Sequence, residues 1–223
     1  MFLPRLASVL LLCVFLPTGP TRAQGAIVGA LRLVDRGERP ASDMTDAVIW
    51  LEGRLPRAAP AAFDILTEAK RFTPRVLAVP TGSTVRFPNH DPFNHNVFSR
   101  SEAAPFDLGL YGRGQSREVV IRRPGVVRIY CNIHASMSAV VVAVDGRFVT
   151  RPGADGVFTL ADVPPGRYTL RAWHERGGEV AREIEVGAAG LAGLSLSLDA
   201  TDYRPAPHLN KLGKPYPAPA RRY

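Results

Sequence analysis

The stretch RIYCNIHASMSAVVV, residues 128–142, holds a cysteine, a histidine and a methionine between two runs of β-forming residues. Cys131, His134 and Met137 follow one another at intervals of three residues. The aromatic and β-branched residues on both sides predict two strands joined by a short loop. Such a loop can fold three side chains around one point, and thiolate, imidazole and thioether are soft donors that suit copper. The stretch therefore predicts a β-fold with a metal-binding loop.

The sequence around this loop predicts many short strands separated by turns. Residues rich in β-branched and aromatic side chains lie at 76–79, 84–87, 96–99, 117–121, 126–130 and 139–144. Proline and glycine punctuate these runs, and close spacing of short strands is typical of an antiparallel β-sandwich. Residues 26–34 and 47–51 predict further strands, whereas residues 63–70 predict a short helix or an irregular connection. The expected fold class is all-β.

The N-terminus has the features of a secretory signal peptide. One early arginine precedes an apolar run at residues 6–16, and Thr21 and Ala23 supply the small residues that signal peptidase requires. The apolar run is about half of the ~20 residues that span a bilayer, so we expect cleavage after Ala23, a periplasmic or secreted protein and no membrane span. The mature chain would carry 26 Lys and Arg against 20 Asp and Glu. It has no basic helix or nucleic-acid-binding motif, so nucleic acid is not an expected partner.

Cleavage would leave Cys131 as the single cysteine, because Cys13 lies in the signal peptide. A single thiol in an oxidising compartment is buried, paired between chains or used as a ligand. A copper site built on the loop lacks one imidazole. The segment FPNHDPFNHNVFSRS, residues 87–101, offers His95 at the start of a strand, with His90 as the alternative five residues earlier.

Two motifs resemble the copper site of the cupredoxins: NHNVF at residues 94–98 and CNIHASM at residues 131–137. The short gap from histidine to methionine is similar to that of the amicyanins. The resemblance covers residues 72–145 and implies a Greek-key β-sandwich with one mononuclear type 1 copper. It implies four copper ligands, namely His95, Cys131, His134 and Met137. It also implies that Asn96 pins the ligand loop and donates toward the cysteine sulfur. His90 has no counterpart in the family pattern. Three roles are open for it: a turn residue, a gate at the edge of the site, or a second copper contact.

A second β block follows the metal-binding region. The segment DGVFTLADVPPGRYTLRAWHE, residues 155–175, alternates apolar and polar residues around a Pro-Pro-Gly turn, and residues 180–198 continue the alternation. This block resembles the carboxypeptidase regulatory-like domains, which implies a packing or interaction module without chemistry of its own. Residues 199–223 are rich in proline and basic side chains, which predicts a disordered tail or an extended strap.

The expected organisation has five parts. They are a signal peptide (1–23), an N-terminal β segment that packs on one of the sandwiches (24–71), a cupredoxin-like domain (72–145), a regulatory-like sandwich (146–198) and the tail (199–223). Four protein ligands leave copper no open position for a substrate, and the five histidines contain none of the His-x-His pairs that announce further copper sites. We therefore expect an electron carrier rather than an enzyme, serving a dehydrogenase or a cytochrome. Copper capture or delivery, and a non-catalytic cell-envelope module, are the alternatives.

Overall fold

A computed structural model describes residues 25–35, 43–205 and 207–217, so the expected signal peptide lies outside the described residues. Within these ranges the chain is all-β, apart from one 3₁₀ helix, η1 (Met44–Asp46). The strands are β1 (Gly25–Val34), β2 (Val48–Glu52), β3 (Ala62–Asp64), β4 (Leu66–Glu68), β5 (Arg71–Thr73), β6 (Val76–Pro80), β7 (Thr84–Pro88), β8 (His95–Ser99), β9 (Phe106–Tyr111), β10 (Ser116–Val120), β11 (Gly125–Cys131), β12 (Ser138–Val144), β13 (Val149–Thr150), β14 (Val157–Val163), β15 (Gly166–His174), β16 (Gly178–Val186) and β17 (Leu191–Asp199). The prediction of an all-β protein is confirmed.

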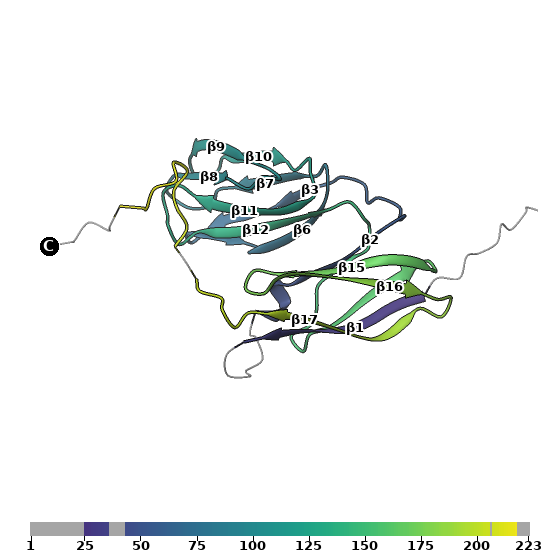
Figure 1. Ribbon diagram of the computed structural model, residues 1–223. Helices are drawn as coiled ribbons and strands as arrows, with labels where there is room; N and C mark the ends of the chain where they lie inside the picture. Colours follow the sequence, from purple (N-terminus) through teal and green to yellow (C-terminus); the bar gives the residue numbers. More distant parts are fainter. Residues whose placement is uncertain (1–24, 36–42, 206, 218–223) are drawn as a thin grey trace, which may run out of the picture.

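The strands form two β-sandwiches, one above the other in Figure 1. The first sandwich packs the five-stranded sheet β6-β12-β11-β8-β9 against the sheet β10-β7-β3, with the hairpin β4-β5 beside them. The second packs the sheet β14-β1-β17 against the sheet β13-β2-β15-β16. The described residues include no helix long and apolar enough to cross a membrane.

The N-terminal strands, which the sequence could not assign, are divided between the two sandwiches. Strand β1 pairs with β14 and, in parallel, with β17, while β2 pairs with β15, so both complete the second sandwich. Strand β3 pairs in parallel with β7 and belongs to the first. The chain thus begins in the second sandwich, builds the first and returns to finish the second.

The helix or irregular connection expected at residues 63–70 is wrong. The structure has the strands β3 and β4 there, because Ile65 and Thr67 are buried and Phe63 packs against the core, with a period of two. The turn into β5 contains Ala69 and Lys70, both at positive φ (51° and 56°). Two successive left-handed residues are typical of a type I′ hairpin turn, which the sequence does not announce with asparagine or glycine.

Strand β12 is buried on both faces, which explains its unbroken apolar sequence. Ala139, Val141 and Ala143 belong to the core of the first sandwich, whereas the residues between them face the second sandwich. That interface contains Val48, Trp50, Val76, Val140, Val142, Val144 and Trp173. The two sandwiches are therefore joined by a shared apolar layer as well as by the chain.

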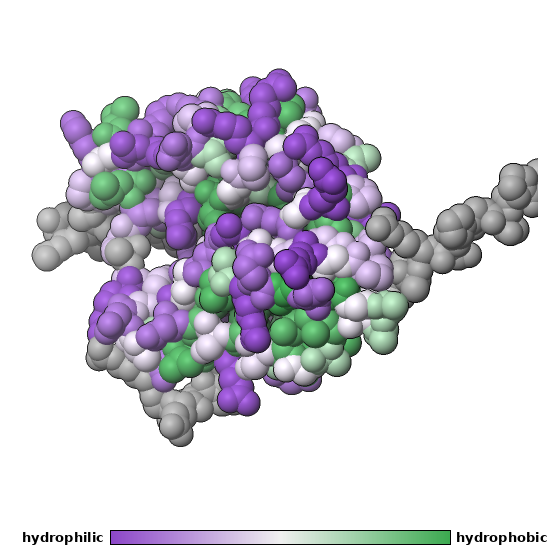
Figure 2. Space-filling model, turned by 45° about the vertical axis from the view of Figure 1, so that its right-hand side comes forward, coloured by the Kyte–Doolittle hydropathy of each residue, from purple (hydrophilic) through white to green (hydrophobic). Residues whose placement is uncertain are grey.

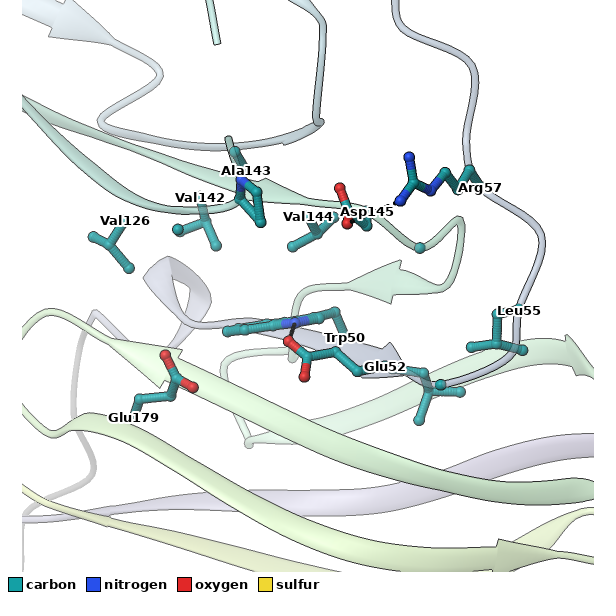
Figure 3. Close-up of a pocket in the computed structure, with 15 residues that line it drawn as sticks. Trp50, Glu52, Leu55, Arg57, Val126, Val142, Ala143, Val144, Asp145 and Glu179 are labelled. Carbon is teal, nitrogen blue, oxygen red and sulfur yellow. Dashed lines mark hydrogen bonds and ion pairs between the residues drawn. The ribbon is translucent and has the colours of Figure 1, made fainter. Parts of the chain in front are cut away.

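The interface is incompletely filled at one edge. A cavity of about 550 Å³ lies there, and Figure 3 shows the Trp50 ring on one side of it and Val142 and Val144 of β12 on the other. Glu52 accepts a hydrogen bond from the Trp50 indole at 3.2 Å. Figure 2 shows that hydrophilic residues alternate with hydrophobic ones on the face it presents, and that the hydrophobic residues are most evident on the lower, second sandwich.

The C-terminal segment after β17 returns to the first sandwich. Residues 200–205 and 207–217 form no strand; the former leave β17 at the second sandwich, and the latter run past one end of the first sandwich (Figure 1). The backbone N–H of Lys211 donates to the Asn132 side chain at 3.0 Å, and the Tyr216 hydroxyl donates to the Cys131 carbonyl at 2.6 Å. Of the two forms expected for this segment, the structure shows the extended strap over these residues.

Candidate metal centre

The candidate site forms where two neighbouring strands of the first sandwich begin and end. Strand β8 begins at His95, and its antiparallel neighbour β11 ends at Cys131, which is the register partner of Val97. A backbone hydrogen bond of 2.8 Å from Asn132 N–H to the Asn96 carbonyl continues this pairing into the loop. The strand register therefore brings the upstream histidine beside the cysteine.

The loop then folds back on itself and places His134 opposite His95. The N–H of Met137 donates to the His134 carbonyl at 3.0 Å, and the N–H of Cys131 donates to the Met137 carbonyl at 3.3 Å. The Nδ1 atoms of His95 and His134 each lie 3.6 Å from the Cys131 sulfur. These three donor atoms all lie within 4.8 Å of one another, which is the separation expected of ligands around one metal ion.

The other residues predicted for the site occupy different places. Met137 is buried in the core of the first sandwich, directly after the loop turn, so its role as an axial ligand stays a prediction. His90 is exposed and lies outside the donor cluster, and its N–H donates to the Thr67 carbonyl. The structure therefore brings His95, and not His90, to the cysteine.

Asn96 contacts the ligand loop through its main chain and not through its side chain, and its expected role toward the sulfur stays a prediction. Its side-chain amide donates to Asp107 and to the Gly109 carbonyl of β9, away from the ligand loop. Its carbonyl accepts from the Asn132 N–H at 2.8 Å, and its own N–H is one of the groups that lower the pKa of Cys131. The side chain thus fixes β8 against β9, while the backbone holds the loop and the sulfur.

Asp91 is a residue of the site that the sequence analysis missed. Its carboxylate is only 4% exposed and lies 2.9 Å from His95 Nε2. It also accepts the N–H groups of Ala69 and Lys70, at 2.7 and 3.0 Å. A carboxylate only accepts, so it keeps the proton of a neutral His95 on Nε2 and leaves the Nδ1 lone pair for a metal. The available signal was an acidic residue four positions before the histidine, in the turn NHDP.

The electrostatics of the cluster favour a thiolate. Burial alone would raise the pKa of Cys131, but hydrogen bonds from His95 and from the N–H groups of Asn96, Ile133 and His134 lower it below the usual value. Burial would lower the pKa of His95, yet its contacts with Cys131 and Asp91 raise it. Both directions favour a thiolate at Cys131 and a proton on the facing imidazole of His95, and a metal bound at the sulfur would take the place of that proton.

His134 has the opposite tendency. Burial, the charge of His95 and that of Lys70 lower the pKa of His134, so this imidazole is neutral at pH 7 and ready to bind a metal. The Phe93 ring packs against both histidines, with ring centroids 5.4 Å from His95 and 5.2 Å from His134, while the two histidine rings lie 4.8 Å apart. Of the two histidines, His95 is fully buried and His134 only partly, so the site reaches solvent through His134.

The donor set is a test of whether copper fits. One buried thiolate and two imidazoles, with a methionine next in the same loop, match the His₂Cys trigonal set with a weak axial methionine that is diagnostic of blue-copper centres. The residues present therefore fit copper.

Comparison with known proteins gives structural likeness only. No protein-family model and no curated protein matches the chain. A purple cupredoxin from Nitrosopumilus maritimus is 26% identical, over 36% of this chain and 98% of its own, with a TM-score of 0.33. A reduced amicyanin variant is 19% identical, over 43% of this chain and 98% of its own, with a TM-score of 0.36. A copper-containing nitrite reductase from Thermus scotoductus SA-01 is 20% identical, over 52% of this chain and 28% of its own, with a TM-score of 0.37. Because these TM-scores are below 0.5, the chemistry of the site rests on its own atoms.

Proposed function

We propose that the protein carries single electrons through a copper site whose ligands are His95, Cys131, His134 and Met137. The observation that carries this proposal is the approach of two imidazole Nδ1 atoms to one buried sulfur, each at 3.6 Å. Copper, when bound, would supply a one-electron couple. This ligand set suits electron transfer because the coordination geometry that it offers is intermediate between those that the two oxidation states prefer.

The protein is proposed to be a carrier rather than an enzyme. Four protein ligands would leave no coordination position for a substrate. His95 is fully buried and tied to Asp91, so it would serve to fix the site, whereas the partly buried His134 would be the point of electron entry and exit. Ile133, beside it, is 44% exposed and offers an apolar contact for another protein. We propose a redox protein, a dehydrogenase or a cytochrome, as the partner.

The remaining parts of the chain are assigned supporting roles. The N-terminal sequence supports export to the periplasm or beyond the cell. The second sandwich is proposed to be a regulatory-like packing module, because the layer that it shares with the first sandwich is apolar and its own core is separate. It would hold the copper sandwich without taking part in the chemistry.

Titration of the mature chain, residues 24–223 without a metal-affinity tag, with Cu(II) tests the proposal. An intense visible band that saturates at one copper per chain, disappears on reduction and returns on oxidation is expected. Cys131→Ser is the matched variant, because it removes the thiolate and keeps a side chain of similar size, and it should lose the band. Tight Cu(I) binding without the band would favour copper capture or delivery. Binding of Zn²⁺ in preference to copper, or of neither, would refute the electron-transfer proposal.

A further inference from the structure

The C-terminal strap, defined as residues 207–217, touches the ligand loop at several points. We propose that this strap is a positioning element of the metal centre and that Tyr216 is its positioning residue. The inference rests on the proposed function for its consequence in copper binding, but the positioning itself is a property of the metal-free chain.

Tyr216 holds the peptide that follows the cysteine. Its hydroxyl donates to the Cys131 carbonyl at 2.6 Å, and the N–H on the other side of the same peptide, that of Asn132, donates to the Asn96 carbonyl at 2.8 Å. A planar peptide held at both its oxygen and its nitrogen has a fixed orientation. That orientation directs the chain onward to Ile133 and to His134, whose Nδ1 lies 3.6 Å from the Cys131 sulfur. Tyr216 thereby acts on the sulfur through the backbone.

Lys211 provides a second point of attachment, also at the loop. Its N–H donates to the Asn132 side-chain oxygen at 3.0 Å, and its ammonium lies 2.7 Å from the Asp107 carboxylate. Asp107 also accepts from the Asn96 side chain. The strap is therefore linked to Asn132 of the ligand loop directly and to Asn96 of β8 through Asp107. The strap, the loop and β9 are therefore joined by one set of hydrogen bonds.

His208 provides a third point of attachment. Its ring stacks on Tyr130, the residue before the cysteine, with a centroid distance of 4.2 Å and an interplanar angle of 21°. Its Nδ1 lies 3.3 Å from both the Leu209 carbonyl and the Tyr216 hydroxyl. The carbonyl only accepts, so Nδ1 carries the proton and can also donate to the Tyr216 oxygen. Three successive residues at the start of the loop, 130–132, thus each have a contact from the strap.

The strap also contains a turn that is closed by its own hydrogen bonds. The Asn210 side-chain oxygen accepts from the N–H groups of Leu212 and Lys214, and Gly213, at φ 75°, closes the turn with its N–H on the Asn210 carbonyl. A preformed turn loses little conformational entropy when it binds, so few contacts suffice to hold it.

The strap is not an apolar cover for the sandwich. Its leucines point to solvent, with Leu209 46% and Leu212 72% exposed. The groups that it directs at the protein are a hydroxyl, a backbone N–H, an ammonium and an imidazole. A cover would bury the leucines, whereas a positioning element presents polar groups to the backbone and side chains that it fixes.

The test compares Tyr216→Phe with Tyr203→Phe, which makes the same change in the same C-terminal segment but packs against the second sandwich. In the metal-free protein, hydrogen exchange of the amides at residues 132–134 should be about five-fold faster in Tyr216→Phe, because one hydrogen bond of about 1 kcal/mol is lost. With copper, Tyr216→Phe should lose the metal to a chelator about ten-fold faster and shift its visible band. Tyr203→Phe should match the wild type in every measurement.

Equal exchange at residues 132–134 in Tyr216→Phe and in the wild type would overturn the inference. So would an equal effect of Tyr203→Phe, which would assign the change to the segment as a whole. Because the exchange measurement needs no metal, it decides the positioning role even if the wild type binds no copper, and that second result would refute the proposed function alone.

Discussion

Replacement of Asp91 by asparagine tests the support of the site most directly. Three donors converge on the two carboxylate oxygens: Ala69 N–H on Oδ1, and Lys70 N–H and His95 Nε2 on Oδ2. Asparagine has nearly the same shape but only one acceptor oxygen. Its better orientation keeps the oxygen at the Oδ2 position, which leaves Ala69 N–H facing an amide NH₂.

The expected loss of stability follows from these contacts. One hydrogen bond to a charged group is lost, which costs about 2 kcal/mol. The two others become bonds to a neutral oxygen, and each of them weakens by about 1 kcal/mol. The lower cost of burying a neutral amide offsets part of this sum, so we expect a destabilisation of about 3 kcal/mol. For a chain of this size the melting temperature should fall by about 9 °C. The effect should be largest in the turn at Ala69 and Lys70, whose positive φ angles these bonds maintain.

Urea unfolding of the metal-free protein measures the effect, with Asp64→Asn as the control. Asp64 is an exposed carboxylate paired with Arg86, so its variant should lose less than 1 kcal/mol. Hydrogen bonds lower the pKa of Asp91 despite its burial. Its stabilisation is therefore complete above the unfolded pKa near 3.8 and is lost as the pH falls through the folded value. The difference between Asp91→Asn and the wild type should thus be full at pH 7 and shrink below pH 4. A loss at pH 7 no larger than that of the control would refute the reasoning.

Three further predictions concern the ligands and the interface. His95→Ala should abolish the visible copper band while His90→Ala keeps it, because only His95 lies in the donor cluster; absorption spectra would show the reverse if the ligand were misassigned. Met137→Leu should retain copper and raise the reduction potential, measured by voltammetry, since a weak donor to the oxidised ion is lost; an unchanged potential would place Met137 in the core alone. Trp50→Ala should cost about 3 kcal/mol in calorimetry, at the low end for a buried tryptophan because the ring borders a cavity, and should leave the copper band unchanged.

The strands and the three-residue donor cluster could be predicted because their signals are local. The ligand loop lies between two long β-forming runs, and a histidine at the start of another strand is where a sandwich can supply a further ligand. Residues 63–70 were mispredicted because a short apolar run fits helix and strand alike, and the turn at Ala69 lacks the residues that favour positive φ.

The supports of the site could not be predicted, since each depends on long-range packing. Asp91 reaches a turn 21 and 22 residues earlier; the pairing of β4 with β5 forms that turn, and the bridge between Thr67 and Asn89 brings it to Asp91. The contact between Tyr216 and Cys131 spans 85 residues and arises from a segment whose composition indicated little structure. In both cases a polar side chain contacts a backbone group, and such a contact leaves no periodic pattern in the sequence.

The way in which the two sandwiches are connected bears on the choice between electron transfer and copper delivery. The strap follows β17 of the second sandwich and contacts the first. The ligand loop is thus held by Asn96 of the first sandwich and by Tyr216 of the strap. His95 is held separately by Asp91. A site fixed by contacts that do not involve the metal changes little when the metal gains an electron, which favours transfer. Delivery needs ligands that separate easily from the metal. Of the four proposed ligands only His134 is partly exposed. The supports around the sulfur therefore favour a carrier.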